Sequence, residues 1–136
     1  MILPADETVS MERHQKILSN SEEVLTDLGI PYRILDICTG DMSLGKYISH
    51  DIESWMPSRN SYGETHSASS FLDFQARRLN IRYRDADGTL KTCFTANNTV
   101  IACPRFLIAL IENNQNADGS INIPEALQSY MGKTKI

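Results

Sequence analysis

The chain has 136 residues, enough for one hydrophobic core of ordinary size, and this length excludes a multi-domain enzyme. Hydrophobic residues make up 41% of the chain and charged residues 22%, a composition that excludes a disordered or fibrous protein. The formal net charge of -4 provides no global positive field for nucleic acid or an anionic membrane, so any RNA contact has to be local.

The first predicted element is an amphipathic helix of about five turns, with Ser10 as its N-cap and with Gly29 and Pro31 as its stop. Between these limits, apolar residues recur at spacings of three, four and seven. We interpret the charged opposite face of the helix as a solvated face without a function.

Strand patterns follow this helix. Residues 32–38 alternate and then break at a turn, and residues 52–56 alternate again as far as Pro57. The small polar stretch from 61 to 69 has a weaker strand pattern, and a helix of two turns is predicted over 73–79. These segments favour a sheet with a short helical connection.

A β-hairpin is predicted next, because Asp85-Ala86-Asp87-Gly88 between residues 81–84 and 90–95 supplies the Asp-Gly pair that suits a tight turn. Residues 97–102 predict one more strand.

Pro104 suits the first turn of a helix whose residues 106–111 are apolar on nearly all sides, a pattern that predicts a buried helix. A short helical segment over 124–131 closes the chain. The elements together predict an α+β fold, a mostly antiparallel sheet flanked by helices.

The cysteines form no zinc-ligand pattern, and we expect reduced, buried or half-buried thiols at Cys38, Cys93 and Cys103. The longest apolar run has six residues, whereas a membrane-spanning helix needs about 20. No secretory signal pattern opens the sequence, so we expect a cytoplasmic protein without membrane contact.

Short catalytic motifs such as G-x-G-x-x-G, G-x-x-x-x-G-K-[ST], G-x-S-x-G and H-E-x-x-H do not occur. The histidines His14, His50 and His66 are scattered, and an isolated histidine is more often structural than catalytic. Composition and periodicity alone therefore indicate no function.

Longer stretches, however, resemble the seryl-tRNA synthetases, which are class II aminoacyl-tRNA synthetases. Residues 62–84 combine an acidic residue, a serine-rich loop and the run Asp-Phe-Gln-Ala-Arg-Arg, and residues 97–113 are similar to class II motif 3. Other stretches match that family in order and spacing, namely 28–33, 38–41, 51–57, 116–120 and 123–127. The resemblance implies that residues 1–136 form the C-terminal portion of a class II synthetase catalytic core, from after motif 2 onward.

This resemblance implies serine-tRNA ligase activity, in which serine and ATP form seryl-adenylate and the seryl group then moves to serine tRNA. Attack on the α-phosphate needs positioning, a divalent cation and cationic groups, so no dedicated catalytic residue is expected. ATP and Mg²⁺ are the implied cofactors, serine and serine tRNA are the implied partners, and the full-length enzyme is implied to be a homodimer.

The residues implied in ATP binding are Glu64, Thr65, His66, Ser67 and Arg105. Glu64, with Ser67 three positions on, matches the pair that faces the ATP phosphates through magnesium, an ion that prefers hard oxygen ligands. Thr65 and His66 replace the commoner Ile and Ser of that loop, although an imidazole can still bond ribose or phosphate. Arg105 matches the motif 3 arginine, whose planar fork can lie over adenine and donate to phosphate. Outside this context, Glu64 would be interpreted as a solvated carboxylate.

Asn97 and Thr99 occupy the place where the family holds the substrate serine. A group that bonds the serine hydroxyl rejects alanine, because alanine would leave that buried group unpaired. The alternative is that Asn97-Asn98 is simply a turn.

Three arginines, Arg77, Arg78 and Arg82, invite a nucleic-acid interpretation, but aspartates lie nearby at 73, 85 and 87. We therefore expect ion pairs that fasten the sheet and place no tRNA there.

The family's helical tRNA-binding arm, motif 1 and motif 2 have no counterpart in these residues. We therefore expect the chain alone to be inactive, with the activity belonging to a full-length parent. The missing strands predict an open sheet edge and an apolar patch, which favour self-association. The alternatives are a stand-alone synthetase-like binding or regulatory module without aminoacylation activity and a paralogue that loads an amino acid onto a carrier protein.

Overall fold

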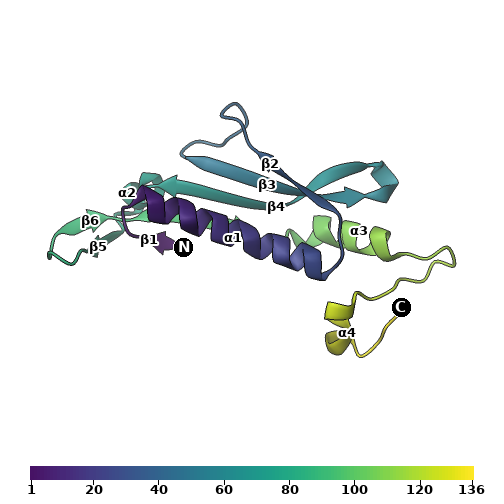
Figure 1. Ribbon diagram of the computed structural model, residues 1–136. Helices are drawn as coiled ribbons and strands as arrows, with labels where there is room; N and C mark the ends of the chain where they lie inside the picture. Colours follow the sequence, from purple (N-terminus) through teal and green to yellow (C-terminus); the bar gives the residue numbers. More distant parts are fainter.

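Two helices cover one face of a five-stranded antiparallel sheet in the computed structural model of the chain, which describes residues 1–136 (Figure 1). The strands lie in the order β1 (Ile2–Leu3), β7 (Phe94–Thr99), β4 (Ser61–Leu72), β3 (Ile48–Met56) and β2 (Tyr32–Asp36). A separate two-stranded sheet consists of β5 (Arg82–Arg84) and β6 (Leu90–Thr92). The helices are α1 (Glu7–Asp27), α2 (Phe74–Leu79), α3 (Cys103–Asn114) and α4 (Glu125–Met131), with a 3-10 turn, η1 (Pro57–Arg59). The predicted α+β class and antiparallel sheet are confirmed.

The ends of α1 show how the sequence stops and starts a helix. Asp6 is the N-cap, and its carboxylate accepts a hydrogen bond of 3.0 Å from the amide of Val9. The predicted Ser10 cap is wrong, because Ser10 lies inside the first turns with its buried hydroxyl 3.0 Å from that of Ser70. At the other end, Gly29 adopts a φ of 65° and the amide of Ile30 donates back to the carbonyl of Leu25, which confirms the predicted stop.

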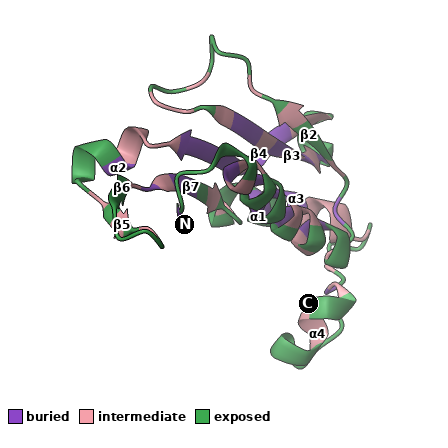
Figure 2. Cartoon of the chain, turned by 60° about the vertical axis from the view of Figure 1, so that its left-hand side comes forward, coloured by how far each residue is buried: buried purple, intermediate pink, exposed green.

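The core lies between the sheet and the two helices that share one of its faces (Figure 2). Helix α1 packs on β4 and β7, and α3 packs on β3 and β4. The eleven residues of the main apolar cluster are Leu3, Ile17, Leu18, Leu25, Ile30, Ile52, Met56, Ala68, Ala96, Phe106 and Ala109. The predicted all-round burial of α3 is wrong, because Leu107 and Ile108 are 52% and 46% exposed.

Polar side chains also join α1 to the sheet. His14 Nε2 lies 2.7 Å from His50 Nδ1, and His50 Nε2 lies 2.6 Å from a carboxylate oxygen of Asp36. The side-chain amide nitrogen Nδ2 of Asn98 donates to the carbonyl of Ile17 in α1. Burial disfavours a charged imidazole at His14 and, with the repulsion of a charge on His50, lowers its pKa to about 4.

The strand boundaries depart from the sequence pattern around Cys93. The predicted hairpin is confirmed, but its second strand ends at Thr92, because Cys93 is the junction at which the chain passes from the small sheet to β7. The following strand ends at Thr99 rather than at Ala102. The weak pattern over 61–69 belongs to β4, which is the longest strand and the centre of the sheet.

The exposed features of the chain differ partly from expectation. Cys93 is buried, but Cys38 and Cys103 are exposed, so the prediction of buried or half-buried thiols is wrong for these two. On the side of β7 away from β4, strand β1 pairs only with Phe94 and Thr95, so this edge of β7 is open alongside Asn97–Thr99. None of the helices is both long enough and apolar enough to cross a membrane.

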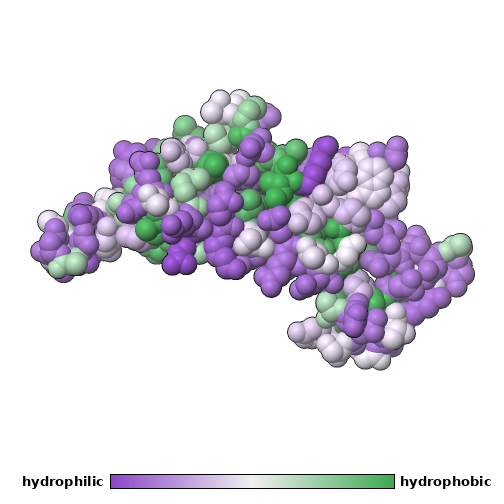
Figure 3. Space-filling model, viewed as in Figure 1, coloured by the Kyte–Doolittle hydropathy of each residue, from purple (hydrophilic) through white to green (hydrophobic).

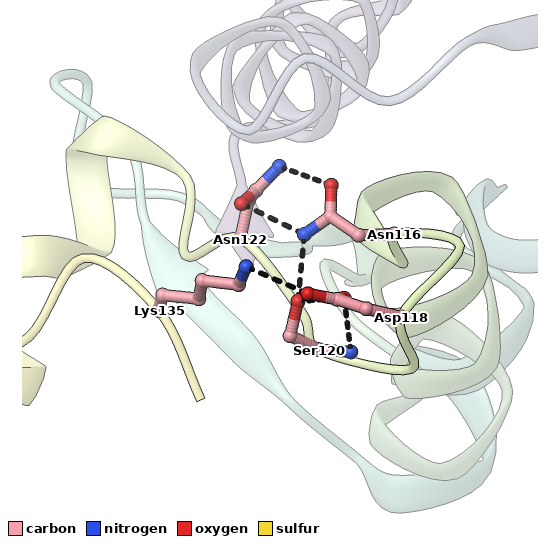
Figure 4. A network of polar contacts seen from close by, with 5 residues as sticks. All are labelled: Asn116, Asp118, Ser120, Asn122 and Lys135. Atoms are coloured by element: carbon pink, nitrogen blue, oxygen red, sulfur yellow. Dashed lines mark hydrogen bonds and ion pairs between the residues drawn. The ribbon is translucent and has the colours of Figure 1, made fainter.

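A polar network holds the last segment of the chain (Figure 4). Asn116 and Asn122 exchange amide hydrogen bonds of 3.0 and 3.1 Å, and the amide of Ser120 donates 3.0 Å to Asp118. Lys135 pairs with the same carboxylate at 3.3 Å. The turn at Asp118 and Gly119 is therefore tied to the end of the chain.

Acidification is expected to destabilise the fold through His14. Its pKa is about 4 when folded and about 6.5 in an unfolded chain, so the unfolded state binds the proton first. The contribution of the neutral imidazole is complete above about pH 6.5 and falls as the pH drops toward 4. Urea unfolding of a His14→Gln variant should show a smaller loss of stability between about pH 7.5 and 5 than the native chain.

The exposed neighbour Arg13 supplies the control, since Arg13→Gln should leave the pH dependence unchanged. An equal pH dependence in the native chain and the His14→Gln variant would contradict the assignment.

Candidate functional site

The sheet face that points away from α1 and α3 carries most of the predicted binding residues. Strand partners share a face, and Ser67 pairs with Asp51 on one side and with Thr99 on the other. Asn98 points toward α1, so its neighbours Asn97 and Thr99 point away from it. We call this surface the open face, defined by Asp51, Glu53, Glu64, Ser67, Asn97 and Thr99.

A β-bulge at Thr65 puts Glu64 and Ser67 on the same face. Residues three apart in a regular strand lie on opposite faces, because side chains alternate with a period of two. The pairing of β4 with β3 passes from His66 opposite Ile52 to Glu64 opposite Glu53, which leaves Thr65 as one extra residue. Both oxygens that were expected to face the ATP phosphates therefore lie on the open face.

Hydrogen bonds of Thr65 hold the bulge from the helix side. Its buried hydroxyl oxygen lies 2.6 Å from the hydroxyl of Ser54, 2.7 Å from His66 Nδ1 and 3.3 Å from the carbonyl of Ile52. Its carbonyl accepts a hydrogen bond of 2.9 Å from the amide of Ala102, directly before α3. The bulge thus fixes the start of α3 as well as the direction of Glu64.

The side chains of Thr65 and His66 lie on the helix side of the sheet, not on the open face. His66 is 1% exposed and packs edge-on against Phe106, with 5.5 Å between the ring centroids. Burial lowers the pKa of His66 to about 4, so the ring is neutral at physiological pH, and its Nε2 has no hydrogen-bond partner. Both side chains point to the helices, where they support the strand, and the contact of residues 65 and 66 with ATP stays a prediction.

Arg105 reaches the open face from the first turn of α3, after Pro104 as predicted. Its guanidinium donates to a carboxylate oxygen of Glu64 at 2.9 Å, with the two side chains 51% and 40% exposed. The pair lines a cavity of about 590 Å³ that also includes Glu53, Tyr62 and Glu112. At this exposure an ion pair stabilises the fold only weakly, and its partners are available to a ligand.

Strand β3 adds residues that the sequence interpretation missed. Glu53 lies opposite Glu64, and Asp51 lies opposite Ser67. Glu53 is paired with Arg33 at 2.6 Å, so each of the two facing glutamates has its own arginine. Alternation through Asp51-Ile52-Glu53 was the signal that places both carboxylates on one face.

Magnesium fits the open face only as an ion that arrives with a ligand. No group of three or more His, Cys, Asp or Glu side chains is arranged to hold a metal by itself. Mg²⁺ typically binds through one or two carboxylates together with substrate phosphates and waters. Glu64 and Ser67, two oxygen ligands on one face, suit that mode.

Asn97 and Thr99 belong to strand β7, so the alternative interpretation of Asn97-Asn98 as a turn is wrong. Both residues are exposed on the open face. Asn97 lies opposite Ser69 and Thr99 lies opposite Ser67. The residues expected to bind serine therefore adjoin those expected to bind the phosphates.

The expected ion pairs of the arginine cluster are mostly absent. Arg77 pairs with Asp73 at 3.0 Å, as predicted. Arg78 instead lies 3.4 Å over the ring of Phe74, and Arg82 forms no ion pair. The prediction is therefore wrong for Arg78 and Arg82.

Comparison with protein families places these observations in context. A family model described as the tRNA synthetase class II core domain (G, H, P, S and T) matches residues 2–114. The chain is 47% identical over 132 residues to a serine-tRNA ligase of Deinococcus radiodurans, covering 97% of this chain and 31% of that protein. It is 50% identical over 127 residues to a serine-tRNA ligase of Rubrobacter xylanophilus, covering 93% of this chain and 30% of the relative.

Solved structures give the same relationship. A seryl-tRNA synthetase from Pyrococcus horikoshii complexed with ATP is 43% identical, with a TM-score of 0.93 over 99% of this chain and 30% of that chain. A cytoplasmic serine-tRNA ligase from Naegleria fowleri in complex with AMP is 34% identical, with a TM-score of 0.90. The match covers 99% of this chain and 32% of the Naegleria chain. The chain therefore spans about three tenths of the length of these relatives.

Removal of the Thr65 hydroxyl is expected to loosen the bulge. A Thr65→Val variant keeps the shape but leaves Ser54, His66 and the carbonyl of Ile52 short of a partner. Such a loss of a buried hydrogen-bonding group costs about 1–3 kcal/mol, which urea unfolding can measure. Thr65→Ser, which keeps the hydroxyl, should lose less, and a Thr65→Val variant as stable as the Ser variant would refute this role.

Proposed function

The chain belongs to the family of the tRNA synthetase class II core domain, and from this premise we propose that it forms the C-terminal part of the catalytic domain of a serine-tRNA ligase. The observation that carries the proposal is the open face, where the bulge at Thr65 joins Glu64 and Ser67 to Asn97 and Thr99. The identity to the Deinococcus and Rubrobacter serine-tRNA ligases supports serine as the amino acid.

Glu64 and Ser67 are the proposed oxygen ligands of magnesium that is carried by ATP. The ion would offset phosphate charge and orient the nucleotide. Arg105 lies beside Glu64 and would donate to a phosphate oxygen and cover adenine. Thr65 and His66 would act by fixing the strand. The complexes of the two structural relatives with ATP and AMP support a nucleotide site in the family.

The reaction would join the carboxylate of serine to the α-phosphorus of ATP and release pyrophosphate. Thr99 and Asn97 would hold the serine hydroxyl, since they are the exposed polar groups of β7 next to Ser67. Positioning of both substrates on one rigid sheet is the main contribution that these residues can make.

The remaining properties belong to the longer protein. We propose that it is a cytoplasmic homodimer and that serine tRNA is its second substrate. Arg105 is the only basic side chain that pairs with Glu64, and one cation does not offset a triphosphate, so the 136 residues alone should not activate serine. A regulatory module without activity is not favoured, because the similar curated proteins are ligases.

A graft tests the proposal directly. The matching segment of the Deinococcus serine-tRNA ligase is replaced by this chain, and serine-dependent exchange of pyrophosphate into ATP is measured for the graft and for the isolated chain. We expect exchange by the graft and none by the chain alone.

Glu64→Gln and Arg105→Lys in the graft should each lower kcat/KM by about 10²–10³, whereas Lys133→Gln, on the exposed tail, should not. A folded graft that exchanges no pyrophosphate with serine, or that tolerates Glu64→Gln, would refute the proposed site.

Thr99→Ala in the same graft tests the serine pocket. Loss of one hydrogen bond to the substrate hydroxyl should raise the KM for serine up to about tenfold, with the KM for ATP unchanged. Discrimination against alanine should fall in parallel. Equal changes in both KM values would instead indicate a general disturbance of the sheet.

A further inference from the structure

The segment that contains α2, β5 and β6 differs in charge from the rest of the chain. Residues 73–92 hold five basic and three acidic side chains, whereas the other residues hold eight basic and fourteen acidic ones. Four of the five basic side chains are arginines within residues 77–84. The segment forms one end of the molecule (Figure 1), and that end is largely hydrophilic (Figure 3). A local positive region therefore sits on a protein whose net charge is -4.

The acidic side chains of this segment form an ion pair with only one of its four arginines. Asp73 pairs with Arg77, Asp85 pairs with Lys91, and Asp87 accepts hydrogen bonds from Thr89. The three remaining arginines have no carboxylate partner: the side chains of Arg78 and Arg84 donate to the carbonyls of Phe74 and Gly88, and the side chain of Arg82 forms no hydrogen bond or ion pair within the chain. A carbonyl satisfies a donor but carries no charge, so these three arginines have no ion-pair partner, and the segment, with five basic against three acidic side chains, keeps a net charge of +2.

The hairpin holds these arginines toward solvent. The amide of Ala5 donates 3.1 Å to the hydroxyl of Tyr83, so this side of β5 faces the body of the molecule. Arg82 and Arg84 flank Tyr83 and therefore point the other way, with their Cα atoms about 6.6 Å apart. Arg78 is fixed over the ring of Phe74 at 3.4 Å. All three arginines are exposed.

We propose that Arg78, Arg82 and Arg84 bind the phosphate backbone of duplex RNA. Their spacing along β5 is comparable with that of successive phosphates on one strand, and guanidinium groups match phosphate geometry. Such contacts position a duplex without reading its sequence. The choice of RNA rests on the proposed function, whose second substrate is a tRNA, whereas the binding surface itself is independent of the ATP and serine site. An acidic protein segment is the competing occupant.

The test is a fluorescence titration of a labelled RNA hairpin with the native chain between about 50 and 200 mM salt. Three phosphate contacts predict a slope of log Kd against log salt of about 2 to 3. Arg82→Gln, which removes no intrachain bond, should lower the slope by about 1. The triple variant of Arg78, Arg82 and Arg84 to Gln should weaken binding at least about tenfold at the lowest salt, and the triple Lys variant should retain the slope.

The matched control removes three charges elsewhere, with Arg13, Lys16 and Lys133 changed to Gln, and it should bind RNA like the native chain. The proposal is overturned if the native chain does not bind RNA, or if the control loses as much affinity as the triple Gln variant. It is also overturned if Arg82→Gln leaves the slope unchanged, or if polyglutamate displaces the RNA at equal charge concentration.

Pyrophosphate exchange by the graft, which needs no RNA, should be unaffected by the triple Gln variant. Retained exchange without RNA binding would refute only this inference, and RNA binding without exchange would refute only the proposed function.

Discussion

One extra residue in the central strand decides what each side of the sheet presents. Thr65 shifts the alternation of β4 by one residue. Relative to the residues after Thr65, those before it lie on the opposite face from the one that a regular strand would give them. Without the shift, Glu64 would point toward the helices when Ser67 faces solvent, and a carboxylate there would lose its hydration. The shift keeps both residues on the open face and turns Thr65 and His66 toward the core.

The helix side accommodates this shift with polar contacts. Thr65 bonds Ser54 and His66, Ser10 bonds Ser70, and His14 bonds His50. Each contact is buried, so sliding α1 or β4 by one position would leave hydrogen-bonding groups without partners at a cost of about 1–3 kcal/mol each. Apolar packing brings the helices to the sheet, and the polar pairs fix where they lie.

Regular patterns made most elements predictable, and the failures have physical causes. The periods of α1 and β3 and the Asp-Gly hairpin all follow from local sequence. Strand β4 gave a weak signal, because its inward side carries Thr65, His66 and Ser70 and the bulge breaks the alternation.

The site was predictable only in part. Family resemblance supplied the residue types, but the direction of a side chain next to a bulge depends on strand pairing that the sequence does not display. The ion pairs predicted for Arg78 and Arg82 do not form for a similar reason: an ion pair requires two particular side chains to meet, and proximity in sequence does not ensure it.

The ion pairs of the open face connect this geometry to the choice of ligand. Glu53 and Glu64 face each other across β3 and β4, and Arg33 and Arg105 offset their repulsion. If a bare phosphate displaced Glu64 from Arg105, the carboxylate would be left unpaired beside another negative group. A phosphate that carries a divalent cation satisfies both partners at once, because the cation takes the place of Arg105 at Glu64. In the proposed site, the half-exposed pair would therefore favour a metal-bound nucleotide over a free one, because of the arrangement of two charges on neighbouring elements.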